Sequence, residues 1–285
     1  MRIAVASGKG GTGKTMVALG LACAAASRGS ASLVDCDVEE PDCHLFLGGD
    51  GELVEEVAIP VARVAAPRCT LCGKCALACT YKALAVLPRS VMVFDQLCHG
   101  CGACGIACPE GAITEVPRRI GELRSLTRNG LELIWGSLDA GEALATPVIR
   151  RLKALAPDAP VRVLDSSPGT ACPVVETVRG ADLCVLVAEP TPFGLHDLKL
   201  AVGTVRQLGV PLGVVVNRDR GAGGPLSDFL LRQRIQVLDR VPDSLEIAHA
   251  YSRGKVPSEE LPWLADIFGR LLDRIEGVIA GGGRA

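Results

Sequence analysis

Ser7-Gly8-Lys9-Gly10-Gly11-Thr12-Gly13-Lys14-Thr15 is the segment that sets the architecture expected of this chain. It satisfies the phosphate-loop pattern G-x-x-x-x-G-K-[ST]. The apolar run 3–5 precedes it and a helix-compatible stretch, 16–27, follows it, which is the context that the pattern requires. The glycines allow backbone amides to wrap a β-phosphate, and the N-terminus of the following helix favours the anion. Lys14 is predicted to reach the β- and γ-phosphates, and the Thr15 hydroxyl to occupy one position on Mg²⁺.

Outside this loop, apolar segments that lack polar alternation are separated by amphipathic ones. The expected strands are 2–6, 31–35, 161–165, 183–188, 212–216 and 235–241. The expected helices are 15–28, 147–156, 173–179, 195–208, 226–233, 244–252 and 261–279. Such a succession is typical of a parallel sheet that is covered on both faces. The predicted fold class is therefore α/β, with a doubly wound, mostly parallel sheet.

Two runs of four cysteines interrupt this succession with the same spacing, C-x₂-C-x₂-C-x₃-C. The first run is Cys69, Cys72, Cys75 and Cys79, and the second is Cys98, Cys101, Cys104 and Cys108. In two-cluster ferredoxins the fourth cysteine of each run ligates the other cluster. The predicted ligands of one 4Fe–4S cluster are therefore Cys69, Cys72, Cys75 and Cys108. Those of the second cluster are Cys79, Cys98, Cys101 and Cys104.

A zinc ribbon and a disulfide framework are the alternatives for these cysteines. Zinc sites take four ligands in two pairs and do not need an eightfold repeat, and disulfides need an oxidising compartment that nothing else in the chain supports. Short β segments are expected among the cysteines, at 61–65, 84–87, 91–94 and 113–116. The predicted domains are a discontinuous P-loop ATPase domain, 1–60 and 118–285, and an inserted α+β ferredoxin-like domain, 61–117. Within the former, 118–146 is expected to form strands joined by turns, with Asn129-Gly130 as a hairpin signal.

Lys9, which lies early in the phosphate loop, makes that loop resemble the deviant Walker A motif of the MinD/ParA/Mrp and nitrogenase iron-protein class. The resemblance covers nearly the whole chain. Together with the cysteines, it points to a MinD-superfamily P-loop ATPase with an inserted two-cluster ferredoxin domain. It implies that Lys9 reaches across a dimer to the nucleotide of the partner. The expected assembly is an ATP-dependent homodimer, or a heterodimer with a paralogue.

The same resemblance assigns further residues of the nucleotide site. Val34-Asp35-Cys36-Asp37 is similar to switch I, in which Asp37 would orient the attacking water and Asp35 would support the magnesium shell. Asp165 is similar to the Walker B aspartate, and Gly169 lies in the switch II turn, where its amide can approach the γ-phosphate. The implied catalytic residues are Lys9, Lys14, Asp37 and Asp165, and the implied Mg²⁺ residues are Thr15, Asp35, Asp37 and Asp165.

Base recognition is assigned in the same way. Asn217 resembles the strand-end asparagine that reads adenine in this family, and Pro242-Asp243 resembles the loop that walls the other side of the base. Relatives often carry their acidic residue one position later, where this chain has Ser244. The implied nucleotide-binding residues are Gly8, Lys9, Gly10, Gly11, Thr12, Gly13, Lys14, Thr15, Gly169, Asn217, Pro242 and Asp243.

The bulk composition narrows the function classes. The chain has 285 residues, a formal net charge of −2 and only 3% aromatic residues, so a nucleic-acid surface is not expected. No signal peptide and no bilayer-spanning stretch is expected, and the final helix is expected to pack on the sheet rather than on a membrane. Thirteen cysteines beside a phosphate loop indicate a reducing compartment, and the predicted location is the cytoplasm.

The expected function is an Mg²⁺-dependent ATPase whose nucleotide-dependent dimerisation is coupled to the clusters and gates electron transfer to a redox or metal-centre protein. Two alternatives stay open. One is delivery of iron–sulfur clusters or metal centres, as in the Mrp relatives. The other is a MinD-like positioning switch in which the clusters are structural or sense redox state. A bridging cluster like that of the nitrogenase iron protein, which would use Cys172, is not expected, because no cysteine occurs between Cys108 and Cys172.

Overall fold

The structure is a computed structural model that describes residues 1–221 and 223–282. Its strands are β1 (Arg2–Ala6), β2 (Ala31–Asp35), β3 (Glu52–Val64), β4 (Leu84–Val86), β5 (Val91–Val93), β6 (Ile113–Arg128), β7 (Leu131–Leu138), β8 (Val161–Asp165), β9 (Leu183–Ala188), β10 (Leu212–Asp219) and β11 (Val237–Pro242). Its helices are α1 (Lys14–Ala26), α2 (Cys43–Leu47), α3 (Lys74–Ala78), α4 (Ala103–Ile106), α5 (Ala145–Leu155), α6 (Cys172–Val178), α7 (Pro192–Gln207), α8 (Pro225–Arg232), α9 (Leu245–Ser252), α10 (Pro257–Glu260) and α11 (Pro262–Ala280).

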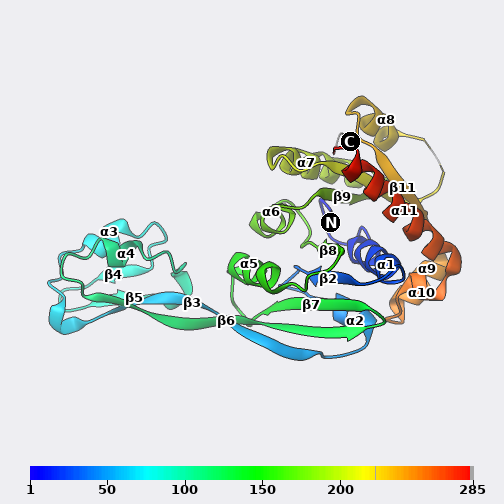
Figure 1. The fold of residues 1–285 in the computed structure, drawn as a ribbon. Helices are drawn as coiled ribbons and strands as arrows, with labels where there is room; N and C mark the ends of the chain where they lie inside the picture. The colour runs from blue at the N-terminus through cyan, green and yellow to red at the C-terminus, as the bar shows by residue number, and fades with distance from the viewer. Residues whose placement is uncertain (222, 283–285) are drawn as a thin grey trace.

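Nine of the strands form one sheet in the order β11-β10-β9-β1-β8-β2-β7-β6-β3 (Figure 1). From β11 to β7 every neighbouring pair is parallel, whereas β7–β6 and β6–β3 are antiparallel. Helices α5 to α8 contribute buried apolar side chains to the core on one face, and α1, α2 and α11 to the core on the other. The predicted α/β class with a mostly parallel sheet is confirmed.

The central strands β1, β8 and β2 lie side by side. Their carboxyl ends therefore meet at one edge of the sheet, where ligands of open α/β sheets bind. The phosphate loop follows β1, Asp35 ends β2 and Asp165 ends β8. This arrangement brings together side chains that are far apart in the sequence.

A long two-stranded ribbon of β3 and β6 leaves the sheet and ends in a separate lobe (Figure 1). We call residues 65–112 the cysteine lobe; it contains α3, α4 and the small β4–β5 hairpin. The predicted domain boundaries, 60/61 and 117/118, fall inside the ribbon, beside the cross-strand pair Pro60 and Pro117. The two strands therefore run without a break from the main sheet to the lobe.

The hairpin expected at Asn129-Gly130 joins β6 and β7, and both turn residues have positive φ, 50° and 78°, as a type I′ turn requires. The expected elements of the main domain are present, with ends shifted by a few residues. The short helices α2 and α10 and the extension of β3 back to Glu52 were not predicted from the sequence.

The apolar stripe of α11 is buried against α1 and β11, as expected of a helix that packs on the sheet. The buried side chains are Leu264, Ile267, Phe268, Leu271, Leu272 and Ile275. Within the described part of the chain, no helix is long and apolar enough to cross a membrane.

Candidate nucleotide site and cysteine lobe

The phosphate loop is fixed from two sides. Gly13 directly precedes α1 with φ 87°, a conformation that favours glycine. The Asn217 side-chain amide donates a 2.7 Å hydrogen bond to the carbonyl of Thr12, and both residues are buried. From switch II, the Gly169 amide donates to the carbonyl of Ser7 at 2.9 Å. Two of the predicted nucleotide contacts, Asn217 and Gly169, therefore touch the loop itself.

Lys14 and Asp165 form a buried ion pair at the end of β8. The Lys14 Nζ lies 2.8 Å from Asp165 Oδ1, and neither side chain is more than 8% exposed. Burial lowers the pKa of Lys14, but the charge of Asp165 and the hydrogen bond to it outweigh that effect, so the pKa lies above its usual value. Two of the four predicted catalytic residues are thus in contact, with the lysine in its charged form.

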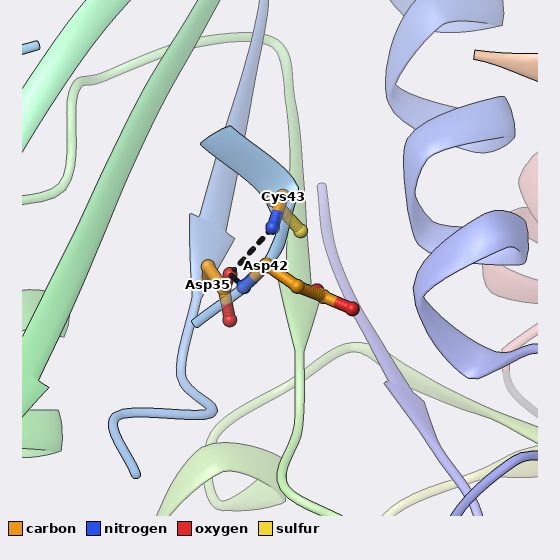
Figure 2. Close-up of side chains that lie close together, drawn as sticks. All are labelled: Asp35, Asp42 and Cys43. Atoms are coloured by element: carbon orange, nitrogen blue, oxygen red, sulfur yellow. Dashed lines mark hydrogen bonds between the residues drawn. The ribbon is translucent and has the colours of Figure 1, made fainter. Parts of the chain in front are cut away.

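Asp35 holds the loop that carries Asp37. Its Oδ1 accepts from the Asp37 amide at 3.1 Å. Its Oδ2 accepts from the amides of Asp42 at 3.1 Å and Cys43 at 3.0 Å (Figure 2). Burial, and then the negative charge of Asp165, raise the pKa of Asp35 to about 7. Because both oxygens accept hydrogen bonds from backbone amides, this carboxylate fixes the segment between Asp37 and Cys43.

Asp37 is half-buried and lies among the charges of Lys14 and Asp165. Burial raises its pKa to about 6, while the positive charge of Lys14 acts in the opposite direction. At neutral pH its carboxylate is therefore mostly ionised and able to accept a hydrogen bond.

Two neighbours of this site were not predicted. The Cys43 thiol donates to Asp165 Oδ2 at 3.7 Å. The Asp42 side chain points away from Asp35 in Figure 2, and burial together with the charge of Asp165 raises its pKa. Asp35, Asp42 and Cys43 place one potential ligand atom each within 4.8 Å of one another. Asp42 was missed because it directly precedes α2, a short helix that the sequence pattern did not predict.

Lys9 contacts its own chain. Its Nζ lies 3.5 Å from Glu189 Oε2, at the end of β9, and its side chain is about one-third exposed. Glu189 also accepts from Arg218 at 2.6 Å. Glu189 was not among the predicted site residues, yet it connects the signature lysine to the residue that follows Asn217.

A cavity of about 320 Å³ lies beside the phosphate loop, between it and α9. Its lining residues are Gly11, Gly13, Met16, Asn217, Arg218, Pro242, Asp243, Ser244, Ile247, Ala248, Tyr251 and Ser252. The three residues predicted to surround the base, Asn217, Pro242 and Asp243, thus share one cavity with two loop glycines. Asp243 is paired with Arg220 at 2.8 Å, and Ser244 caps α9 through the Glu246 amide.

The cysteine lobe contains two further cavities, and each is lined by four cysteines. The first is lined by Cys69, Cys72, Cys75 and Cys108, and the second by Cys79, Cys98, Cys101 and Cys104. The fourth cysteine of each run therefore lies with the first three of the other run. All thirteen cysteines of the chain are free thiols.

In neither cysteine set do three sulfur atoms all lie within 4.8 Å of one another. Among the described residues, the only group of three or more potential ligand atoms that lie within 4.8 Å of one another is Asp35, Asp42 and Cys43. A single zinc ion with Zn–S bonds of about 2.3 Å needs four sulfur atoms closer together than that. Two backbone amides already point at sulfur: Ala83 donates to Cys79 at 3.2 Å, and Ala112 donates to Cys108 at 3.3 Å.

Comparison with known sequences gives one family and two relatives. The sequence model of the CobQ/CobB/MinD/ParA nucleotide binding domain matches residues 3–258. An uncharacterized protein of Methanocaldococcus jannaschii is 34% identical over 221 residues, which cover 76% of this chain and 78% of the relative. A second uncharacterized protein of the same organism is 32% identical over 258 residues, which cover 90% of each chain.

Comparison with solved structures gives the same fold. The cell division ATPase MinD of Pyrococcus furiosus superimposes with a TM-score of 0.60 and 18% identity, over 97% of this chain and 98% of that one. MinD of Pyrococcus horikoshii in complex with Mg-ADP gives 0.58 and 17%, over 100% and 99%. An ATP complex of a Cyanothece McdA variant gives 0.60 and 18%, over 96% of each chain.

Proposed function

This chain belongs to the CobQ/CobB/MinD/ParA nucleotide-binding family, and on that premise we propose that it is a cytoplasmic, Mg²⁺-dependent ATPase that carries two 4Fe–4S clusters. In this proposal ATP-dependent dimerisation changes the state of the clusters and thereby gates electron transfer to a partner protein. The observation that carries the proposal is the grouping of the eight lobe cysteines into two sets of four, on a ribbon continuous with the nucleotide-binding sheet.

The thiol sets suit 4Fe–4S clusters better than zinc. In a cube each thiolate binds a different iron, so the sulfur atoms need not lie within the reach of one ion. The spread of the sulfur atoms in each set agrees with that requirement. The proposed ligands are Cys69, Cys72, Cys75 and Cys108 for the first cluster, and Cys79, Cys98, Cys101 and Cys104 for the second. When bound, such clusters accept and donate single electrons.

The amides of Ala83 and Ala112 would stabilise the charge on the cluster sulfurs, because hydrogen bonds to sulfur are one of the factors that set the potential. They occupy equivalent places in the two runs, four residues after Cys79 and Cys108. The lobe thus offers the same type of donor to both clusters.

At the nucleotide site, the proposed reaction is attack of water on the γ-phosphate, with cleavage of the bond to the β-phosphate and release of ADP and phosphate. Lys14 would exchange its contact with Asp165 for the β- and γ-phosphates. That exchange leaves Asp165 free to act with Thr15 at Mg²⁺. Asp37, held in place through Asp35, would accept a hydrogen bond from the attacking water. Asp35 supports this arrangement by fixing the loop.

Lys9 would act in the partner subunit. Its ion pair with Glu189 is partly exposed, so the free-energy cost of breaking it is small. A lysine that moves to the γ-phosphate of the partner neutralises charge that develops in the transition state, as an arginine finger does. The dimer is proposed to be a homodimer or a heterodimer with a paralogue. The occurrence of two similar proteins in M. jannaschii supports the second possibility.

The burial of the thiols favours electron transfer over cluster delivery. Four of the eight lobe cysteines are buried: Cys75, Cys79, Cys98 and Cys104. A cluster that is handed to another protein must exchange its ligands, and ligands that are buried in their own fold hinder that exchange. We therefore place electron transfer before delivery, and a redox protein before a cluster acceptor as the partner.

The test is anaerobic reconstitution of the full chain, followed by iron and acid-labile sulfide analysis and an ATPase assay with and without Mg²⁺. The proposal expects about eight iron and eight sulfide per chain, since each cube holds about four of each. It also expects phosphate release that requires Mg²⁺. Stoichiometric zinc in protein isolated without oxygen, or a plateau at about four iron per chain, would contradict the cluster assignment. Tight binding of ATP without hydrolysis would contradict the ATPase.

A further inference from the structure

We propose that a close-packed junction at Gly136 links switch I to the ribbon and transmits the nucleotide state to the second cysteine set. The junction consists of Gly136 on β7, Val38 after Asp37, Leu123 on β6 and Val148 on α5. This inference rests on the proposed function, because it explains how the coupling in that proposal is carried.

The switch I backbone continues along β7 after β2 has ended. The paired residues of β2 and β7 end with Asp35 and Trp135. Beyond them, the Leu138 amide donates a 2.9 Å hydrogen bond to the carbonyl of Val38. Val38 directly follows Asp37, the residue proposed to orient the attacking water. Because Val38 is the next residue after Asp37, a displacement of Asp37 acts directly on the hydrogen bond that joins Val38 to β7.

Side chains from three segments, the loop after Asp37, β6 and α5, converge on Gly136. A Cβ at this position would lie 2.9 Å from Val38 Cγ1, 2.9 Å from Val148 Cγ1 and 3.3 Å from Leu123 Cδ2. The side chains of Val38, Val148 and Leu123 are fully buried. Interiors packed at this density do not absorb displacements by compression, so movement of Val38 must shift its neighbours.

The base of the ribbon is tied to the same strand. Leu123 and Gly136 are direct cross-strand partners, and the Asp139 amide donates to the carbonyl of Ile120 at 3.0 Å. Arg119 on β6 forms ion pairs with Glu56 on β3 and with Asp139 beyond the end of β7. Both ribbon strands are thus fastened to the strand that contacts switch I.

The far end of the ribbon meets the second cysteine set. Ala62 of β3 and Glu115 of β6 line the cavity of that set, whereas the cavity of the first set is lined by Val64 and Ile113, which lie farther along the ribbon. Gly100, between Cys98 and Cys101, packs on Pro60 so closely that a Cβ there would lie 2.8 Å from the Pro60 carbonyl oxygen. The second set therefore rests directly on the ribbon and is the nearer one to the sheet.

A tightly packed path of this kind moves as a unit between discrete arrangements. When the γ-phosphate draws Asp37 inward, Val38 shifts against Gly136, and the ribbon follows together with the loop 98–101. The second cluster is expected to respond more strongly than the first, because its loop is the one in contact with Pro60.

The test compares affinity for a non-hydrolysable ATP analogue in oxidised and dithionite-reduced full-length protein. For the parent we expect an affinity ratio of about fivefold or more, the lower end of typical coupling between sites. Gly136→Ala adds a methyl group that separates Val38, Leu123 and Val148. The ratio of nucleotide affinities between oxidised and reduced protein should then lie within about twofold of one, which is less than typical coupling between sites. Electron paramagnetic resonance of the reduced protein should show that the analogue no longer perturbs the second cluster.

The matched control is Gly213→Ala. Gly213 lies in β10, near the opposite edge of the sheet from β7, and the added methyl group would lie 2.6 Å from Cγ of Leu238 on β11. The control therefore carries a packing cost of its own without touching the segment that contains Asp37 and Val38. Its affinity ratio should equal that of the parent. A second variant, Arg119→Gln, tests the same path from the surface if Gly136→Ala does not fold. Its control is Arg28→Gln, which breaks the remote pair with Asp273.

The outcomes separate the two proposals. If Gly136→Ala or Arg119→Gln folds and keeps the affinity ratio of the parent protein, the proposed role of the junction is wrong. The proposed function is not affected by that outcome. A ratio of one in the parent overturns the coupling itself and the junction with it. Loss of the ratio in Gly213→Ala as well would show that general destabilisation, and not the junction, is responsible.

Discussion

The nucleotide edge of the sheet and the cysteine lobe differ in the kind of side chain that they bury. At the sheet edge the charges of Lys14, Asp165 and Asp35 are buried and have partners, since Lys14 pairs with Asp165 and Asp35 accepts hydrogen bonds from three backbone amides. In the lobe only seven residues are buried, and four of them are cysteines without a disulfide partner. These seven are Cys75, Cys79, Ala83, Leu84, Cys98, Cys104 and Ala112.

This difference indicates where each region obtains its stability. The main domain has two large apolar cores, one on each face of its sheet. Domains of fewer than about 70 to 80 residues rarely obtain enough stability from a hydrophobic core alone, and natural ones commonly add disulfides or a metal. With only seven buried residues, the cysteine lobe fits that description. Under the proposed function, clusters supply what the lobe lacks, whereas the main domain folds without them.

The largest difference between the two regions is expected when one proposed cluster ligand is removed. Cys104→Ala should lower the iron content from about eight to about four or fewer per chain, because each cube holds about four irons. The cysteine lobe should then become sensitive to protease, while the main domain keeps its nucleotide affinity. Iron analysis and limited proteolysis measure the two effects.

Cys184→Ala is the control, because Cys184 is equally a buried thiol but lies in β9 of the main sheet. Its iron content should not change. Equal loss of iron in the two variants would show that the lobe cysteines have no special role.

A second variant attacks the sheet edge while leaving the lobe intact. Asp37→Ala should lower ATP turnover by about 10²-fold or more, the usual cost of losing a group that positions a reactant. The variant should still bind MgATP, and it should hold the closed dimer longer because the nucleotide is not consumed. Phosphate release and analytical ultracentrifugation test this, with Asp266→Ala as the control, because Asp266 lies on the exposed face of α11. Unchanged turnover would remove Asp37 from the mechanism.

The two lysines of the phosphate loop are expected to have different roles, so their alanine variants should lose different properties. Lys14→Ala should weaken nucleotide affinity by roughly tenfold or more, since it removes a charge-assisted contact worth about 1.5–3 kcal/mol. Lys9→Ala should keep that affinity and lose ATP-dependent dimerisation. Titration with a fluorescent ATP analogue and measurement of dimer mass separate the two. Dimerisation of Lys9→Ala at the parent concentration of ATP would refute the role across the interface.

The smallest expected effect concerns protonation at the sheet edge. Burial raises the pKa of Asp37 to about 6 in the folded protein, above the ordinary value of 3.8. The folded state therefore holds this proton more tightly than the unfolded state. Its contribution to stability is largest below pH 4 and is lost as the pH rises through 6.

Asp37→Asn removes the buried charge that forms at high pH. Without Mg²⁺ and nucleotide, its Tm should exceed that of the parent at pH 8 by roughly 2 to 4 °C, the shift that about 1 kcal/mol produces in a domain of this size. The difference should shrink as the pH falls towards 4. A Tm gain that is independent of pH would show that the Asp37 charge is not its cause.

The main sheet was predictable because its signals are local. Apolar runs without alternating polar residues predict buried parallel strands. The phosphate-loop pattern predicts the turn from strand to helix, which the structure has at Gly13. Lys14 and Asp165 could be assigned to one site from the sequence because the carboxyl ends of neighbouring parallel strands meet at one edge. Their ion pair was seen only in the structure. The hairpin at Asn129-Gly130 was predictable from its turn chemistry.

The remaining features depend on contacts between distant segments. The ribbon extends β3 back to Glu52 through pairing with β6, and no short-range pattern around Glu52 reports that pairing. Glu189 became visible as the partner of Lys9 only through the order of β1 and β9 in the sheet. Gly136 reads as an ordinary strand glycine until Val38, Leu123 and Val148 are seen to converge on it.

The central claim is that nucleotide binding at the sheet edge and reduction of the proposed clusters in the cysteine lobe are thermodynamically coupled. A redox titration of the reconstituted protein with and without a saturating non-hydrolysable ATP analogue and Mg²⁺ tests this most directly. Because coupling between binding equilibria is reciprocal, a tenfold change in nucleotide affinity on reduction must appear as a shift of about 59 mV in a one-electron potential. The account predicts that the two quantities change together by matching factors. Potentials that the analogue does not change, with equal nucleotide affinities for oxidised and reduced protein, would contradict it.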